Sequence, residues 1–262
     1  MDLPELHQRF LDDVLPRIQQ DGRITGIAVT GSIAAGEADD RSDVDLLLIV
    51  DDADYAAVTE QRLELVASWT PLVVGFTGEH VGEPRLIITL VGPPLLHVDL
   101  MFIRLVDLAD RQEDPLILFD RDGLLALTVT QHPSAPDVVD LQWIEDRFWV
   151  WIHYAATKLG RGELYEVIGF LAFLRDRVFG PMAAMRAGLR PRGVRRLERI
   201  DPAVTRELRA TLSGYDLREA EAALLACVDI YQRWLEELGP EIDTHPTAAE
   251  LAVGYLRQVI AS

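Results

Sequence analysis

The chain has 262 residues and carries 43 acidic and 25 basic side chains, which give a formal net charge of −18 at pH 7. A surface of this charge repels nucleic acid, so the composition disfavours a polymerase or a general nucleic-acid-binding protein. The single cysteine, Cys227, excludes an internal disulfide, and neither a membrane span nor a secretory signal is evident, so we expect a cytoplasmic globular protein.

The first half of the chain alternates between helical and extended patterns. Residues 2–20 place apolar side chains at helical intervals, and the Asp-Gly pair that follows predicts the end of this helix. Residues 54–68 predict a second helix. Short apolar runs bounded by glycine and proline predict strands at residues 25–31, 43–50, 71–77, 85–91 and 95–105. The short spacing of these runs favours a mixed or antiparallel sheet over repeated βαβ units.

From about residue 132 the pattern becomes helical. The segment "HPSAPD" reads as a proline-rich joint, and the longer segments after it have helical periodicity. The predicted helices cover residues 137–159, 163–179, 202–213, 216–238 and 246–261. We therefore expect an α+β fold with a mixed-sheet domain in residues 1–132, followed by an α-helical bundle in residues 133–262.

Two aspartates interrupt an apolar strand in "GSIAAGEADDRSDVDLLLIV". Asp43 and Asp45 are two residues apart, so in a strand they share one face, while Val44 and Leu46 point to the other. Adjacent carboxylates beside a core repel each other, and burial is costly for them unless a cation neutralises their charge. Oxygen ligands of this kind suit Mg²⁺. The pair alone is also compatible with a solvated strand end.

The residues around this pair favour a metal and phosphate site. Gly31 and Ser32 follow a strand about ten residues before the aspartates, and a glycine lets the backbone approach a phosphate closely. A third carboxylate, Asp99, lies inside another apolar strand, with His97 on the same face. Three acids on two strands of one sheet suit two bridged metal ions and in-line phosphoryl or nucleotidyl transfer.

The stretch "VTGSIAAGEADDRSDVDLLLIV" resembles the signature of the polymerase-β-like nucleotidyltransferase superfamily. That signature is a strand, a Gly-Ser turn, a spacer and an Asp-x-Asp strand, with a third carboxylate on a later strand, and this resemblance covers about residues 24–105. The added helical bundle is similar to the antibiotic nucleotidyltransferases, which adenylylate aminoglycosides or lincosamides. One position departs from the pattern, because Ala35 stands where many relatives have an arginine, and Arg41 or the helical domain would have to replace that contact.

The resemblance implies a transferase of the EC 2.7.7 type that uses two Mg²⁺ ions with a bound nucleoside triphosphate. Asp43 and Asp45 would hold both ions, and Asp99 would hold the catalytic one. The hydroxyl of a small-molecule acceptor would attack the α-phosphorus of ATP, and pyrophosphate would leave with AMP transferred. The nucleotide-binding residues implied are Gly31, Ser32, Ser42 and Lys158.

The general base and the contacts from the helical domain stay open. Asp99 is one candidate for the base, and the others are Glu145, Glu163 and Glu166, although an exposed helix charge is the simpler interpretation of each glutamate. His97 is compatible with a substrate contact or with a structural hydrogen bond. Lys158 is the only lysine beside 24 arginines, and it suits either the nucleotide phosphates or the last turn of a helix.

Two other functions are compatible with the same residues. Toxin-type relatives modify protein or tRNA, and an Arg-rich segment at 186–209 is compatible with nucleic acid, although the overall charge favours a solvated surface. A nucleotide-binding module without catalysis is the other alternative, and the intact set of three acids argues against it. The acidic surface favours a cationic acceptor, as in antibiotic resistance, and homodimers are common in the group that the chain resembles.

Overall fold

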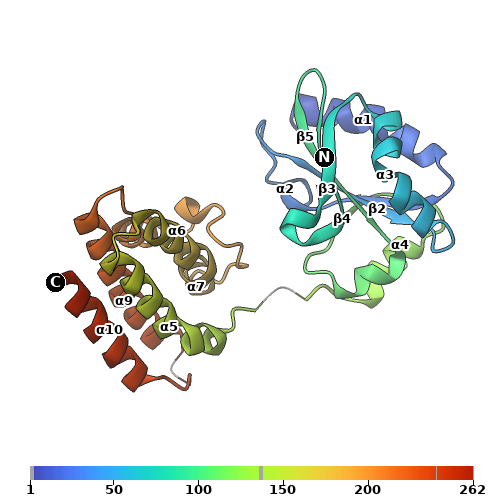
Figure 1. Ribbon diagram of the computed structural model, residues 1–262. Coiled ribbons are helices and arrows are strands. Elements are labelled where there is room, and N and C mark those ends of the chain that lie inside the picture. The colour runs from blue at the N-terminus through green and yellow to red at the C-terminus, as the bar shows by residue number, and fades with distance from the viewer. Residues whose placement is uncertain (1–2, 136–137, 240, 262) are drawn as a thin grey trace. The chain divides into compact units, whose positions relative to one another are not determined.

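The computed structural model describes residues 3–135, 138–239 and 241–261. Two compact units are present, one up to residue 136 and one from residue 137 onward (Figure 1). The last two residues of the proline-rich joint, 136–137, and the predicted start of a helix at 137 lie outside the described residues.

The N-terminal unit is built on a six-stranded mixed sheet with the strand order β3-β4-β5-β2-β1-β6. Strands β2 and β5 are parallel, and every other neighbouring pair is antiparallel. The strands are β1 (Ile24–Val29), β2 (Val44–Val50), β3 (Leu72–Gly78), β4 (Glu83–Val91), β5 (Leu96–Ile103) and β6 (Leu116–Asp120). The predicted mixed sheet is therefore confirmed, and β2 and β5, which carry the aspartates, are central neighbours.

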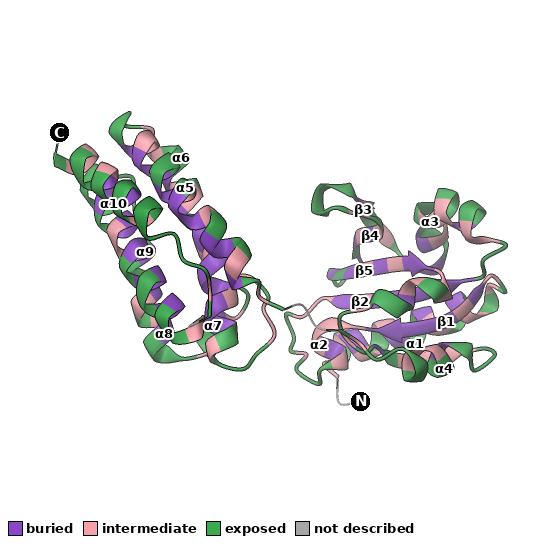
Figure 2. Cartoon of the chain, turned by 90° about the horizontal axis from the view of Figure 1, so that it is seen from below, coloured by how far each residue is buried: buried purple, intermediate pink, exposed green. Residues whose placement is uncertain are grey.

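Helices cover both faces of this sheet. On one face α1 (Glu5–Gln20) and α3 (Tyr55–Trp69) pack on the strands through buried apolar side chains that include Val14, Ile18 and Val66. On the other face α4 (Leu124–Gln131) and the 3-10 helix η2 (Leu105–Asp110) form a smaller core. Because β2 is covered on both faces, its residues from 46 to 50 are all buried, as the purple colour of the central strands in Figure 2 shows.

Two elements of this unit are absent from the sequence-based prediction. Strand β6 pairs with β1, with Val29 opposite Leu116, and α4 follows it, capped by the Asp120 carboxylate, which accepts hydrogen bonds from the N–H groups of Leu125 and Ala126. Both elements are short and lack strong periodicity. Short connectors complete the unit: α2 (Gly31–Ala34) and η1 (Glu79–Val81).

The C-terminal unit is helical, as predicted. Its α-helices are α5 (Leu141–Gly160), α6 (Leu164–Leu174), α7 (Gly180–Arg186), α8 (Pro202–Leu208), α9 (Leu217–Leu238) and α10 (Pro246–Ala261). The segment predicted as one helix over 163–179 is α6 followed by a π-helical turn, η3 (Arg175–Phe179), and two 3-10 turns, η4 (Leu197–Arg199) and η5 (Arg209–Thr211), flank α8. Aspartates 140, 201 and 216 cap α5, α8 and α9 through their side chains.

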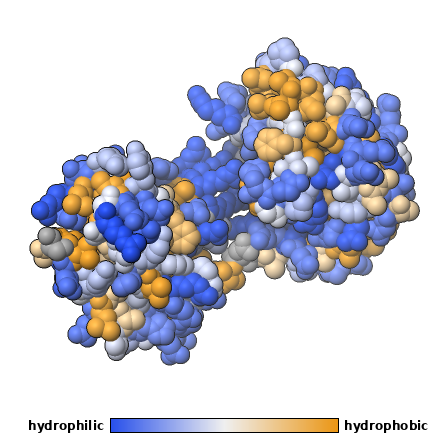
Figure 3. Space-filling view, viewed as in Figure 1, coloured by the Kyte–Doolittle hydropathy of each residue, from blue (hydrophilic) through white to orange (hydrophobic). Residues whose placement is uncertain are grey.

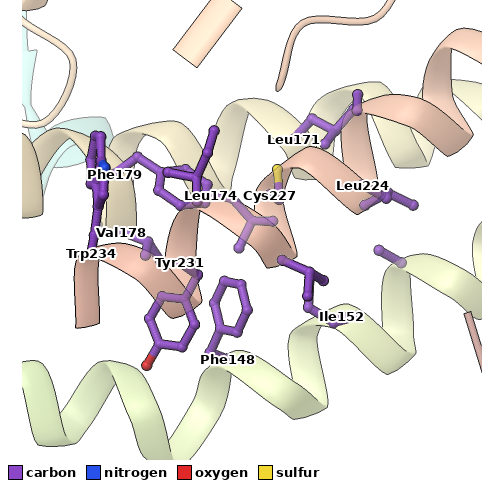
Figure 4. Packing of buried hydrophobic residues seen from close by; sticks show 14 of the residues in the cluster. Phe148, Ile152, Leu171, Leu174, Val178, Phe179, Leu224, Cys227, Tyr231 and Trp234 are labelled. Carbon is purple, nitrogen blue, oxygen red and sulfur yellow. The ribbon is translucent and has the colours of Figure 1, made fainter. Parts of the chain in front are cut away.

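Aromatic stacking organises the core of this unit. The rings of Phe148 on α5 and Tyr231 on α9 stack with centroids 3.6 Å apart (Figure 4). The ring of Trp149, on the same helix as Phe148, meets Tyr231 edge-on. Cys227 lies in the same core, where burial raises the pKa of its thiol to about 12. The cysteine is therefore a small core residue, as its helical sequence context predicts.

Hydrophilic residues dominate the visible surface of both units, with apolar residues exposed between them (Figure 3). Edge strand β3 contributes Val73, Val74 and Phe76 to the exposed apolar residues. In the described part of the chain, no helix is both long and apolar enough to cross a membrane.

Candidate active site

The turn after β1 brings the backbone against the Asp45 carboxylate. Gly31 has φ +62°, a conformation that residues with a side chain rarely adopt, and a Cβ at this position would lie 2.3 Å from Asp45 Oδ2. The Thr30 N–H donates to the Asp45 carbonyl oxygen over 3.0 Å, which fixes the turn on β2. Glycine is therefore required at position 31 for two reasons, its backbone angle and the closeness of the carboxylate.

The sheet register places the three aspartates close together near the N-terminal part of β2 and on the adjacent strand β5. Asp45 and Asp99 are paired residues of the parallel strands β2 and β5, so their side chains emerge on the same face. Asp43 directly precedes β2. All three aspartates are partly exposed, whereas the residues next to them in the strands are buried. The His97 ring lies 2.9 Å from Asp99 Oδ1, so this histidine orients one of the three carboxylates.

Ser32, the residue after Gly31, adds an unsatisfied hydroxyl. Its Oγ is buried and has no hydrogen-bond partner among the residues that the structure describes. A buried hydroxyl normally finds a partner, so this one indicates a position where a ligand oxygen would complete the site. Together with the close Gly31 backbone and the oxygen donors of the aspartates, it fits a phosphate with a hard divalent cation.

The metal site itself stays a prediction. Within residues 3–135, 138–239 and 241–261, no three His, Cys, Asp or Glu side chains converge closely enough to hold a metal ion. The strand register brings Asp45 and Asp99 side by side, and Asp43 lies two residues before Asp45, just ahead of β2. These three residues remain the candidates for Mg²⁺ ligands.

Ser42 has a local structural role in the loop before β2. Its hydroxyl accepts a hydrogen bond from the Asp39 N–H over 2.9 Å, and its carbonyl oxygen lies 2.7 Å from Nε2 of the buried His7 on α1. These contacts hold the loop that leads into Asp43 and Asp45. The predicted contact of Ser42 with the nucleotide stays a prediction.

Glu113 is a fourth carboxylate at this site, and the sequence-based reasoning missed it. The Gly31 N–H donates to Glu113 Oε1 over 3.2 Å. Glu113 precedes β6, and the antiparallel pairing of Val29 with Leu116 brings the two segments together. Only a prediction of β6 and of its pairing with β1 would have placed Glu113 beside Gly31.

In the helical unit, Lys158 and two of the candidate glutamates form one polar cluster. The Lys158 ammonium donates to Glu163 over 2.7 Å and lies over the ring of Tyr154, whose hydroxyl donates to Glu166 over 3.0 Å. The hydrogen bond between Lys158 and Glu163 raises the pKa of the lysine and lowers the pKa of the glutamate. Lys158 is thus an ion-paired cation within the helical unit, and its predicted contact with the nucleotide stays a prediction.

Glu145 occupies a different environment from the other candidate bases. Its side chain is 2% exposed, and its carboxylate accepts hydrogen bonds from Trp149 Nε1, the Tyr231 hydroxyl and the His245 N–H over 2.6–3.0 Å. These bonds tie α5 to α9 and to the start of α10. They also help to keep Tyr231 neutral, since burial and the nearby Glu145 raise the pKa of its hydroxyl.

The comparisons with known proteins agree with the motif. The nucleotidyltransferase domain family matches residues 11–92, a range that contains the Gly31 turn, Asp43 and Asp45. Asp99 lies beyond the matched range. A comparison with curated proteins found no match.

Two solved structures are similar to this chain at low sequence identity. An aminoglycoside 6-adenyltransferase from Bacillus subtilis is 16% identical, with a TM-score of 0.42, and the alignment covers 96% of this chain and 98% of the other. A nucleotidyltransferase-like protein from Exiguobacterium sibiricum is 15% identical, also with a TM-score of 0.42, with 90% and 81% covered.

The family match coincides with the part of the sheet that holds Gly31 against Asp45. The resemblance to nucleotidyltransferases seen in the sequence is thereby confirmed, so the chain carries a nucleotidyltransferase domain in its N-terminal unit and is a nucleotidyltransferase enzyme.

Proposed function

We propose that this enzyme transfers AMP from ATP to a hydroxyl of a small molecule in a Mg²⁺-dependent reaction. An aminoglycoside- or lincosamide-type compound is the proposed acceptor, which would make the enzyme an antibiotic-modifying one. The family match supports nucleotidyl transfer, and the finer assignments of nucleotide, metal and acceptor rest on the site residues and on the resemblance of the sequence.

One observation carries the proposal: the contact between the Gly31 turn and the Asp45 carboxylate. A Cβ on Gly31 would lie 2.3 Å from Asp45 Oδ2, so the backbone that suits a phosphate lies in contact with a carboxylate that suits a cation. Asp99 is register-paired with the same Asp45. A metal-bound polyphosphate would suit both the Gly31 backbone, through its phosphate oxygens, and the aspartate carboxylates, through its cation.

The protein residues mainly bind and orient the reactants. The Gly31 backbone and the Ser32 hydroxyl would bind the β- and γ-phosphates, which leaves the α-phosphorus open to the acceptor hydroxyl. Mg²⁺ bound by Asp43, Asp45 and Asp99 would supply charge neutralisation of the phosphates and of the departing pyrophosphate. The Asp99 carboxylate, oriented by His97, is the proposed acceptor of the hydroxyl proton.

Charge supports a cationic acceptor. Residues 1–130 contain 24 acidic and 9 basic residues, a difference of −15, whereas residues 131–262 contain 19 and 16, a difference of −3. The unit that carries the catalytic aspartates therefore accounts for most of the net charge of −18. Such a field steers amine-bearing molecules toward the site and repels polyanions such as RNA.

A two-stage binding and turnover experiment tests the proposal. Nucleoside triphosphates are first screened with Mg²⁺ by thermal shift, because a ligand that binds the folded state raises the apparent stability. Pyrophosphate release is then measured with the selected nucleotide and a panel of aminoglycosides, lincosamides and uncharged sugars. Release that depends on both Mg²⁺ and an amine-bearing acceptor supports the proposal. Labelling of protein or RNA in a cell lysate, without turnover on the panel, contradicts the small-molecule acceptor.

A further inference from the structure

Glu113 accepts a hydrogen bond from the backbone of Gly31, which the proposed function assigns to the phosphates. Its Oε1 accepts the hydrogen bond of the Gly31 N–H over 3.2 Å, in the same turn whose neighbour, Ser32, carries the unsatisfied hydroxyl. This N–H belongs to the backbone assigned above to the phosphates. A carboxylate and a phosphate therefore compete for one donor, and both are anions.

The loop that carries Glu113 is firmly held. The Arg111 side chain, only 7% exposed, donates to the Asp114 carboxylate over 2.7 Å and to the carbonyl oxygens of Leu108 and Val129 over 3.0 and 2.7 Å. The Ala135 N–H donates to the Arg111 carbonyl oxygen over 3.1 Å. The loop is thus held on both sides of Glu113, which places this residue beside the turn.

The charge of Glu113 acts differently on metal-free and metal-bound polyphosphate. A metal-free triphosphate carries about four negative charges, and at separations of a few ångströms each one repels a nearby carboxylate strongly. A divalent cation held by Asp45 and Asp99 would cancel part of the charge on the same phosphates and weaken that repulsion. Glu113 would therefore keep the free polyanion away from the Gly31 N–H, whereas the metal complex would displace the Glu113 carboxylate from it.

We propose that Glu113 is a specificity-determining residue that makes the nucleotide site accept polyphosphate only together with a divalent cation. The proposal deepens the function proposed above and rests on it, because it takes the Gly31 turn as the phosphate site. It assigns to Glu113 the exclusion of free polyphosphate, a role distinct from the cation binding assigned to the aspartates.

Binding of inorganic triphosphate tests this inference without an acceptor and without turnover. Its dissociation constant is measured by titration calorimetry on the full chain, once in excess EDTA and once in Mg²⁺. Four proteins are compared: wild type, Glu113→Gln, Glu113→Ala and a control, Glu64→Gln, which removes the same charge from the exposed face of α3. Thermal unfolding of each protein shows that it is folded.

We expect the affinity for triphosphate in EDTA to increase from wild type to Glu113→Gln and further to Glu113→Ala. Glu113→Gln keeps an acceptor for the Gly31 N–H but loses the charge, and we expect at least about a tenfold gain in metal-free affinity, equal to about 1.4 kcal/mol. Glu113→Ala removes both the acceptor and the charge and gains more. Both variants keep metal-bound affinity near that of wild type, and Glu64→Gln changes neither value.

Two results would overturn the inference. If wild type binds the Mg²⁺ complex and neither Glu113 variant gains metal-free affinity, Glu113 does not exclude the free anion. If the variants lose affinity for the Mg²⁺ complex, Glu113 helps to bind the metal instead. Failure of the proposed function looks different, because then wild type binds triphosphate neither with Mg²⁺ nor in EDTA, and the inference falls with it.

Discussion

Replacing Gly31 with alanine tests whether the contact between the turn and Asp45 determines activity. The new Cβ would lie 2.3 Å from Asp45 Oδ2, whereas ordinary contacts begin at 3.4 Å, so the carboxylate has to move by about 1 Å. A misplacement of about 1 Å can cost on the order of 100-fold in rate. The left-handed backbone, at φ +62°, adds about 1–2 kcal/mol of strain for alanine.

A matched glycine separates these two effects. Gly123 has φ +74°, and no atom beyond its chain neighbours lies within 4 Å of the position that a Cβ would take there, so Gly123→Ala introduces the backbone strain without a clash. Both variants are expected to lose about 1–2 kcal/mol of unfolding free energy in urea titrations. Only Gly31→Ala should also lose affinity for the Mg²⁺ complex of a non-hydrolysable ATP analogue, measured by calorimetry. Equal nucleotide affinity in the two variants, with both folded, would refute the assigned role of the turn.

Three further predictions concern the helical unit. Lys158→Met should raise the KM for ATP severalfold with a smaller change in kcat, since a phosphate contact mainly affects binding, and an unchanged KM would assign the lysine to its pair with Glu163 alone. Glu145→Ala leaves three donors without their acceptor and should reduce the unfolding free energy by about 3 kcal/mol in urea, whereas a loss below about 1 kcal/mol would contradict its role in tying the helices. Because the folded-state pKa of Glu163 is lowered, its stabilising contribution is present at neutral pH and lost as pH falls through that pKa. The stability difference between wild type and Glu163→Gln should therefore vanish in acid, and a difference that persists there would contradict the ion pair.

Much of the geometry of the candidate site is predictable because its residues are close together in the sequence. The period of two in a strand places Asp43 and Asp45 on one face, and that prediction needs only local geometry. Asp99 is farther away, but an aspartate within an apolar strand is unusual enough to be noticed. The parallel pairing of Asp45 with Asp99, which brings the two strands together, is a tertiary feature that the structure supplied.

Glu113 escaped prediction for a physical reason. Nothing in the local pattern around residue 113 distinguishes it from an exposed loop glutamate, and its importance comes from the pairing of β6 with β1. Strand β6 was itself missed, because its five residues, partly exposed, show no clean alternation. The same limit explains why the sequence could not separate the buried Glu145 from Glu163 and Glu166, which lie on helices with comparable patterns.

The fate of the phosphate groups tests the central claim most directly. The enzyme is incubated with Mg²⁺, a responsive acceptor and ATP that carries a label on either the α- or the γ-phosphate, and the acceptor is then recovered. The account predicts label on the acceptor from the α-position only, and no transfer by Asp45→Asn. Transfer of the γ-label, or full activity of Asp45→Asn, would contradict it.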